Sequence, residues 1–309
     1  MQARETRSQL GWLEKRLGTG GAKTRALYAW SRRLRHRKEL ALRRGSVAER
    51  HKSPRLSIPR DEGYTVVSAG QIPEANEIAE TSRRLVDDAL RELSVAGDTS
   101  ARRKTQLLTG LLPDEALTRD SPFIRFALRS DVIQCVSEYL GFVPILASVD
   151  VWGSVPSSER NNSQLFHCDW ADLRQVKIFI YASEVRIENG PLVVMGASDS
   201  AAVRRRIGYR WRGERYRVPD DRMKSLSAVG EGNALLGPAG TVALVDTCQC
   251  FHYGSRLTEP GTSRALCAMR FTLPSAFSAP SDPASRAPLH HLATPDMSPV
   301  ERLVLGTID

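Results

Sequence analysis

Short apolar runs separated by Gly, Pro or polar stretches dominate the second half of this chain. Residues rich in Val, Ile, Leu and aromatic side chains recur at 145–155, 176–182, 191–195, 241–247 and 265–273. Several short strands divided by turn residues are typical of an all-β sandwich or barrel. The pattern therefore predicts a β domain in this half of the chain.

Helical spacing of apolar residues marks the region before these strands. It predicts an amphipathic helix over 73–93 and a second helical region over 122–140, with Gly141 as its C-terminal cap. A short strand is expected earlier, at 63–67. The expected fold class is mainly β with flanking helices.

Charge is distributed unevenly, which changes the picture of the N-terminal end. The whole chain carries 44 Lys/Arg and 35 Asp/Glu, a net charge of +9. Residues 1–60 alone hold 17 Lys/Arg and 4 Asp/Glu, whereas the remainder holds 27 and 31. Leucines and Trp30 at near-helical spacing predict helical structure within 9–44, and the composition of 45–61 is typical of a linker. Residues 1–60 are therefore expected to form a mobile basic helical arm. Such an arm suits nucleic acid, an anionic membrane surface or an acidic partner, and a merely solvated helix is the plain alternative.

Composition excludes several classes of protein. A chain of 309 residues with 41% apolar and 26% charged residues is ordinary for a globular protein. No apolar run approaches the length of a membrane span, and the beginning of the chain lacks the apolar stretch of a secretion signal. Five cysteines, an odd number, do not indicate a disulfide framework. We therefore expect a cytoplasmic protein with a main domain over 61–275 and a peripheral Pro-, Ser- and Ala-rich tail over 276–309.

Two segments carry candidate metal ligands. His167 and Asp169 stand two residues apart, so in an extended chain their side chains lie on the same face. His252 follows the apolar run 242–245 and could supply a third ligand from a distant strand. Two histidines and one carboxylate form a facial triad that leaves positions open on Fe(II). A His-x-Asp pattern alone is weak, because a strand-end histidine hydrogen-bonded to a neighbour gives the same letters.

Further motifs accompany these residues in a fixed order. Asn189-Gly190-Pro191-Leu192 leads into Met195-Gly196-Ala197-Ser198, and Arg264 follows His252. With these pieces in this order, the segment from Gly63 to Leu273 resembles the phytanoyl-CoA dioxygenase family of Fe(II)- and 2-oxoglutarate-dependent oxygenases. That family has a Pro-Gly-Ser-His-like sequence where this chain reads Met-Gly-Ala-Ser, a departure within a structural turn. The resemblance implies a double-stranded β-helix, the jelly-roll or cupin-like barrel.

The resemblance also implies roles for individual residues. His167, Asp169 and His252 would bind Fe(II), and Arg264 would pair with the distal carboxylate of 2-oxoglutarate, for which a guanidinium fork is suited. Three further residues are implied in the pocket: Ser255 as a second 2-oxoglutarate contact, Phe179 where many members have a tryptophan facing the co-substrate, and Gln164 before the metal motif. Asp169 favours hydroxylation or desaturation, because halogenating members replace this carboxylate with a small residue.

The implied activity is that of an oxidoreductase, a dioxygenase that uses Fe(II), 2-oxoglutarate and O2 to hydroxylate an unactivated C–H bond of a small metabolite. A basic insertion over 203–224 is expected to close over the active site as a lid. It holds nine Lys/Arg against three acids, interleaved with Tyr209, Trp211 and Tyr216, which suits a phosphorylated, coenzyme A-linked or carrier-bound substrate. Stacking on nucleobases and a solvated surface loop are the alternatives for this insertion.

Two alternatives exist for the protein as a whole. One is an oxygenase that acts on a macromolecule recruited through the basic arm. The other is a cupin-like binding protein without turnover. The intact His-Asp-His set and Arg264 argue against the second.

A zinc site is a competing interpretation of His252. Cys248, Cys250 and His252 alternate, so in an extended strand they would share a face with Asp246. A structural zinc site needs four ligands, and the sequence offers no second ligand pair at suitable spacing. Both cysteines are therefore expected to be small buried residues near the iron pocket, and Cys168 is expected to point away from the metal.

Overall fold

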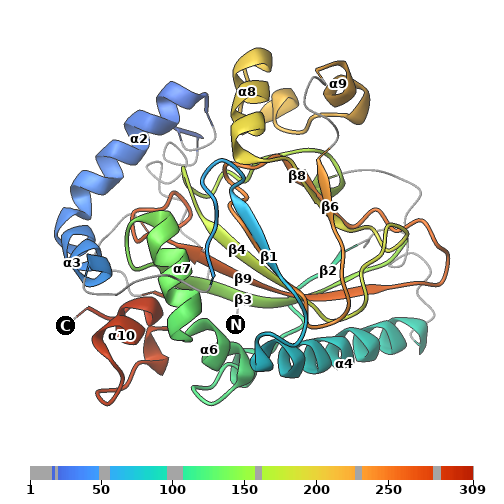
Figure 1. The fold of residues 1–309 in the computed structure, drawn as a ribbon, viewed down its shortest axis with the longest axis horizontal. Helices are drawn as coiled ribbons and strands as arrows, with labels where there is room; N and C mark the ends of the chain where they lie inside the picture. Colours follow the sequence, from blue (N-terminus) through green and yellow to red (C-terminus); the bar gives the residue numbers. More distant parts are fainter. Residues whose placement is uncertain are drawn as a thin grey trace.

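In the computed structural model the chain forms two antiparallel β-sheets, and helices cover the outer side of the larger one (Figure 1). The structure describes residues 16–17, 20–48, 56–95, 107–156, 162–226, 232–280 and 287–308. The larger sheet has the strand order β1-β7-β4-β9-β3-β2, and the smaller has the order β6-β5-β8. The strands are β1 (Tyr64–Val67), β2 (Leu107–Leu108), β3 (Ile145–Ser154), β4 (Val176–Tyr181), β5 (Leu192–Val194), β6 (Asn233–Leu235), β7 (Val242–Val245), β8 (His252–Tyr253) and β9 (Arg264–Thr272). This is the double-stranded β-helix predicted from the sequence.

Strand β4 shows how one run of residues serves two cores. Ile178 and Ile180 belong to the core between the larger sheet and the helices, whereas Phe179 and Tyr181 belong to the core between the two sheets. Successive side chains of a strand point to opposite faces, so a central strand with both faces covered reads as an almost continuous apolar run. The polar exception, Lys177, lies on the inner face with Phe179 and Tyr181.

Helices cover the outer face of the larger sheet. Helix α4 (Pro73–Val95) lies across β3, β4 and β9, and α6 (Pro122–Ala127) packs on α4. Helix α7 (Ser130–Leu140) ends at Gly141, which has the left-handed φ of 80° expected of a C-terminal cap. The helical region predicted over 122–140 consists of two helices, because the non-helical backbone of Arg129, with φ −56° and ψ 136°, separates α6 from α7. The guanidinium of Arg129 pairs there with Glu74 and Asp131.

The described part of the N-terminal segment packs against the body. Helices α2 (Ala22–Arg35) and α3 (Arg37–Ala48) follow its outer edge (Figure 1). The Arg43 guanidinium is fully buried and donates to the carbonyls of Val143, Pro144 and Leu303. Over these residues the segment is not a mobile arm, and the expected linker begins inside α3. The domain limits at 60 and 275 remain predictions.

The expectation of a peripheral C-terminal tail is wrong for the described residues. Helix α10 (Pro299–Leu305) buries Leu303, Val304 and Leu305 in the core between the larger sheet and the helices, the helix-side core. Its start is fixed by a capping box between Ser298 and Glu301. The overall Pro-, Ser- and Ala-rich composition of the segment did not reveal this short apolar run, which is buried.

The basic insertion is a packed helical cap rather than a solvated loop. It contains the end of α8 (Ala197–Ile207) and all but the last residue of α9 (Asp220–Ser225). Tyr209 and Trp211 are buried, and the Tyr209 ring lies 4.9 Å from both the Trp211 and Phe251 rings. These two aromatic residues are therefore part of a core and do not offer faces for nucleobases. Elsewhere in the described residues, short 3-10 helices are present at Asp114–Ala116, Asn162–Gln164 and His290–Leu292, and one lies within the insertion at Gly213–Arg215.

In the part of the chain that the structure describes, no helix has both the length and the apolar character needed to cross a membrane.

Candidate metal centre

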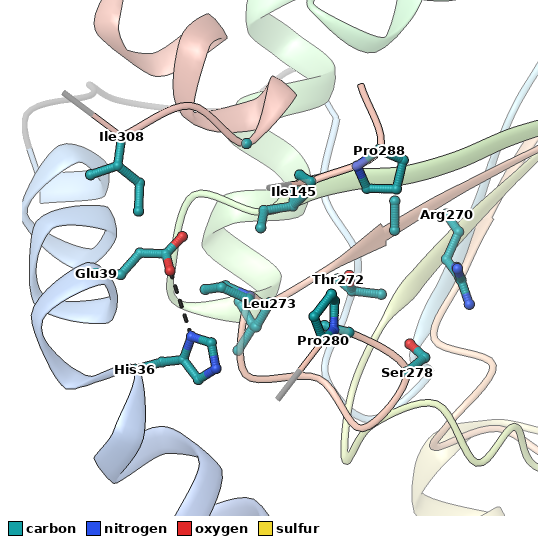
Figure 2. Close-up of a pocket in the computed structure, with 15 residues that line it drawn as sticks. His36, Glu39, Ile145, Arg270, Thr272, Leu273, Ser278, Pro280, Pro288 and Ile308 are labelled. Atoms are coloured by element: carbon teal, nitrogen blue, oxygen red, sulfur yellow. Dashed lines mark ion pairs between the residues drawn. The ribbon is translucent and has the colours of Figure 1, made fainter. Parts of the chain in front are cut away.

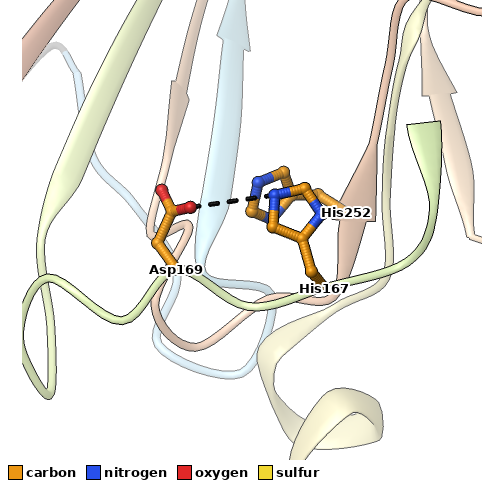
Figure 3. Close-up of side chains that lie close together, drawn as sticks. All are labelled: His167, Asp169 and His252. Atoms are coloured by element: carbon orange, nitrogen blue, oxygen red, sulfur yellow. Dashed lines mark ion pairs between the residues drawn. The ribbon is translucent and has the colours of Figure 1, made fainter. Parts of the chain in front are cut away.

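Backbone pairing brings the two candidate histidines together. The amide of His167 donates to the carbonyl of His252 at 3.1 Å, and the amide of His252 donates back at 2.9 Å. Their ring centroids lie 4.2 Å apart. Asp169 approaches from the same segment as His167, and one ligand atom from each of the three residues lies within 4.8 Å of the others (Figure 3). This is the juxtaposition predicted from the sequence.

Each imidazole is oriented by a backbone carbonyl. Nδ1 of His167 lies 2.8 Å from the carbonyl of Leu165, and Nδ1 of His252 lies 3.0 Å from that of Cys250. A carbonyl only accepts hydrogen bonds, so each Nδ1 carries the proton and each Nε2 carries the lone pair. Burial lowers the pKa of both histidines. Both rings are therefore neutral near pH 7 and present Nε2 as a ligand atom.

Asp169 is held as a carboxylate with one oxygen engaged. Its Oδ2 accepts from Gln175 at 2.9 Å and pairs with the Lys177 ammonium at 2.7 Å, while Oδ1 lies 3.8 Å from Nε2 of His167. Burial opposes ionisation, but Lys177 and the two histidines together lower the pKa of Asp169 far below its usual range. The arrangement leaves Oδ1 directed toward the imidazoles.

Sequence reasoning missed Gln175 and Lys177. The available signal was a lysine in an otherwise apolar strand, which needs a buried anion as its partner. Gln175 is fully buried and also donates to Oγ1 of Thr247 at 2.7 Å, so it ties Asp169 to the turn that follows β7.

The candidate 2-oxoglutarate residues form a second cluster. Arg264 is buried, and its guanidinium donates to Oγ of Ser255 at 2.8 Å and to the carbonyl of Gly190. Ser255 lies 3.0 Å from Oγ of Ser154, and its carbonyl accepts from Gln164 at 2.6 Å. The structure therefore brings together Arg264, Ser255 and Gln164.

Gly190 explains part of the Asn-Gly-Pro-Leu motif. Its φ is +65°, and a Cβ at this position would lie 2.4 Å from the backbone nitrogen of Arg256. Only glycine permits this close approach, which sets the carbonyl of Gly190 against the Arg264 guanidinium. The motif is thus a structural support of the guanidinium.

Phe179 lies on the same interior surface. It is buried between the sheets, directly opposite Ala243 and Ala268 on the neighbouring strands, and its ring lies 6.2 Å from that of Trp152. Because Lys177 and Tyr181 flank it on the same face, Phe179 stands between the carboxylate of Asp169 and the end of the barrel that holds Arg264.

The cysteines do not form a metal site. The chain turns after β7, so Asp246, Cys248 and Cys250 are not in one extended strand as expected. One oxygen of Asp246 accepts from the amides of Cys248 and Gln249, and the other accepts from Tyr139 at 2.9 Å. Within the described residues, His167, Asp169 and His252 make up the single group able to hold a metal. The cysteines are buried, as predicted.

Part of the basic insertion faces the metal centre. Val218 pairs with Phe166, and the Tyr216 ring stands edge-on to His167 at 6.1 Å. The Arg217 guanidinium lies 4.4 Å over the Tyr216 ring and disfavours protonation of both histidines. Its Nη1 is buried and makes no hydrogen bond with any described residue. A buried cationic donor without a partner is costly unless a ligand supplies one.

A separate small hollow of about 100 Å³ lies where α3, β3, β9 and the C-terminal segment meet (Figure 2). Its lining includes the contact between His36 and Glu39 at 3.6 Å and the side chain of Arg270. None of the three candidate metal ligands lines this hollow.

The residues present fit an iron and 2-oxoglutarate site. Two neutral imidazoles and one carboxylate are the donor set of a facial triad. Burial lowers the pKa of Arg264 to about 10, yet its guanidinium remains charged near pH 7. It forms no ion pair within the described part of the chain, and its Nε has no hydrogen-bond partner there. An anionic ligand would satisfy both needs.

No protein-family model and no curated protein matches this chain. Similar solved structures include EctD from S. alaskensis with 2-oxoglutarate and 5-hydroxyectoine, at 15% identity and a TM-score of 0.49 over 83% of this chain and 90% of that one. The epimerase SnoN in complex with Fe3+, alpha ketoglutarate and nogalamycin RO is 14% identical, with a TM-score of 0.47 over 84% and 91%. HygX from Streptomyces hygroscopicus with nickel and 2-oxoglutarate is 14% identical, with a TM-score of 0.41 over 69% and 83%.

At such identities and TM-scores these likenesses say nothing about the function of this chain. The function is inferred from the geometry of the site. The architecture and the juxtaposed triad are those that the sequence resemblance to the phytanoyl-CoA dioxygenase family implies.

Proposed function

We propose that this protein is an Fe(II)- and 2-oxoglutarate-dependent oxygenase that oxidises a C–H bond of a small anionic metabolite. The observation that carries the proposal is the meeting of His167, Asp169 and His252, each of which offers a ligand atom within 4.8 Å of the others. Such a triad leaves coordination positions open for a co-substrate and oxygen. When bound, iron and 2-oxoglutarate supply the oxidising chemistry, which the side chains alone cannot provide.

The chain's own residues prepare the site in three ways. The carbonyls of Leu165 and Cys250 fix the histidine tautomers, and Lys177 with Gln175 fixes the rotation of the Asp169 carboxylate. Arg264 and Ser255 would bind the distal carboxylate of 2-oxoglutarate. Phe179 would pack against its methylene groups and exclude water from the interior of the barrel.

Arg217 supports an anionic substrate. Its guanidinium stands beside the histidines, carries a buried donor without a partner and belongs to the insertion that covers this end of the barrel. A phosphate or carboxylate on the substrate would accept from this donor and place the rest of the molecule against the metal centre. The five cysteines are free and buried, which suits a reducing compartment, so we place the enzyme in the cytoplasm.

An anaerobic titration tests the metal and the co-substrate. Fe(II) followed by 2-oxoglutarate should produce a visible metal-to-ligand charge-transfer band in the native protein. The band should be absent in His167→Ala and unchanged in His291→Ala, a control at an exposed histidine outside the site. Absence of the band in the native protein at saturating Fe(II) and 2-oxoglutarate would refute the oxygenase and return the binding-protein alternative.

A paired substrate screen tests the anionic group. Succinate formation should be stimulated by metabolites with a phosphate or carboxylate and not by their neutral esters. Arg217→Gln should abolish that preference while leaving the 2-oxoglutarate titration unchanged. Equal stimulation by anionic and neutral members would contradict the proposed role of Arg217.

A further inference from the structure

Helix α2 buries two of its arginines and leaves its apolar stripe exposed. Its buried residues are Arg25, Tyr28, Ala29 and Arg32, whereas Leu27, Trp30 and Leu34 are 66%, 62% and 49% exposed. At 3.6 residues per turn these two sets occupy opposite faces of the helix. A helix on a globular protein normally places its apolar stripe against the core. This one presents a leucine–tryptophan–leucine stripe to solvent.

The buried arginines hold the helix in this orientation. Arg25 donates to the carbonyls of Trp170 and Asp172, and its guanidinium lies 4.2 Å over the Trp211 ring. Arg32 donates to the carbonyls of Ser275, Ala279 and Pro280. Rolling the helix to bury Trp30 would break these bonds and leave the carbonyls unsatisfied. The exposed stripe is therefore built into the fold.

Cations surround the apolar stripe. Helices α2 and α3 together hold nine Lys/Arg and one Asp/Glu, and six of the nine cations are exposed. By helical spacing, Lys23 falls on the stripe itself, and Arg33 and Arg35 fall on its two flanks. We call Leu27, Trp30 and Leu34 with Lys23 and Arg33 the α2 ridge.

A hollow extends the ridge at the bend between the two helices. It has a volume of about 540 Å³, and its apolar lining comes from Leu34, Leu42 and Ile308. The polar lining is His36, the cations Arg35, Arg37 and Lys38, and one acid, Glu39, whose carboxylate is paired with Arg43 at 2.8 Å. Leu42 and Ile308 are 48% and 45% exposed. Apolar surface beside these cations suits a phosphate group attached to an acyl chain.

We propose that the α2 ridge docks the protein on an anionic phospholipid surface. Tryptophan and leucine enter the boundary between headgroups and acyl chains, while lysine and arginine contact the phosphates. Both helices lie at the outer edge of the molecule, so the ridge can reach a flat surface (Figure 1). A nucleic acid would engage the cations but would leave the leucines and Ile308 without an apolar partner. The proposal is independent of the proposed oxygenase activity.

Vesicle co-sedimentation of the full chain tests this docking. We expect the native protein to sediment with vesicles of equal parts phosphatidylglycerol and phosphatidylcholine, and to remain in solution with phosphatidylcholine alone. Leu27→Ser/Trp30→Ser should lose binding, whereas Ile187→Ser, at a side chain 59% exposed elsewhere, should retain it. Lys23→Glu/Arg33→Glu should weaken binding by at least about fivefold per cation, whereas Arg205→Glu, exposed on α8, should not.

Several results would overturn the proposal. One is retained vesicle binding by Leu27→Ser/Trp30→Ser with native far-ultraviolet circular dichroism. Another is a native protein that binds neither kind of vesicle but is a dimer, while Leu27→Ser/Trp30→Ser is a monomer. That result would make the partner a second copy of this chain. Failure on vesicles with salt-dependent binding to double-stranded DNA, lost in Lys23→Glu/Arg33→Glu, would assign the surface to nucleic acid. The Fe(II)/2-oxoglutarate band of each variant separates loss of docking from failure of the active site.

Discussion

Replacing Arg264 gives the sharpest test of the co-substrate site. Two of its donors are used by Gly190 and Ser255, and Nε makes no hydrogen bond within the described residues. The guanidinium is fully buried and has no carboxylate partner among the described residues, so a bound 2-oxoglutarate carboxylate would form a buried ion pair with it. Removing one member of such a pair costs about 3–5 kcal/mol. Arg264→Met should therefore weaken 2-oxoglutarate binding by roughly 140- to 4,000-fold.

The assay is the charge-transfer titration of the Fe(II) protein with 2-oxoglutarate. Arg264→Lys keeps the charge but loses the planar fork, so its affinity should fall between those of the native protein and Arg264→Met. Ser255→Ala removes one hydrogen bond that orients the guanidinium and should cost about 1 kcal/mol, close to fivefold. A folded Arg264→Met that binds 2-oxoglutarate as tightly as the native protein would refute the assignment. In that case another cation, such as Arg217, would have to bind the co-substrate.

Three further predictions concern stability. Burial raises the pKa of Asp246 to about 7. Between its ordinary pKa and 7 the folded state keeps a proton that the unfolded chain has released, so the free energy of unfolding falls as pH rises toward and through 7. In urea unfolding, Asp246→Asn should match the native protein at acidic pH and exceed its free energy of unfolding by on the order of 2–4 kcal/mol above pH 7, and equal pH profiles would contradict this. Gly190→Ala should cost about 3 kcal/mol or more, because its φ is positive and its Cβ would meet the Arg256 backbone; a thermal unfolding midpoint equal to that of the native protein would show that the loop rearranges freely. Arg32→Met should lower the free energy of unfolding by about 2–4 kcal/mol, because it leaves three carbonyls without their donor. The exposed variant Arg33→Met should be nearly neutral, and similar urea midpoints for the two variants would show that the hydrogen bonds of Arg32 do not stabilise the fold.

Local pattern was sufficient for most of the barrel. Runs of alternating or continuous apolar residues located β3, β4, β5, β7 and β9 to within two residues of their observed bounds. The i, i+2 spacing of His167 and Asp169 predicted one shared face, and the motif order predicted the partnership with His252 and Arg264. These features depend on neighbours in sequence or on a resemblance that the motifs carry.

Long-range contacts were invisible to that reasoning. The ion pair of Asp169 with Lys177 and its bond to Gln175 depend on how β4 pairs with β7 and β9. The burial of Tyr209 depends on its packing against Phe251, which lies beyond the next two strands in sequence, and Trp211 packs in turn on Tyr209. The C-terminal helix becomes part of the core because its three apolar residues meet the helix-side core.

Helix α2 separates most clearly what each level decides. The sequence alone shows that Leu27, Trp30 and Leu34 repeat at helical spacing and that the surrounding residues are basic. It did not determine which side of the helix faces the protein, since an apolar stripe predicts a helix with its stripe buried. The observed orientation is the opposite, because Arg25 and Arg32 turn inward to donate to backbone carbonyls of the 170–172 and 275–280 loops. Periodicity records one dimension of a helix, whereas its burial depends on which unsatisfied groups the rest of the fold presents to it.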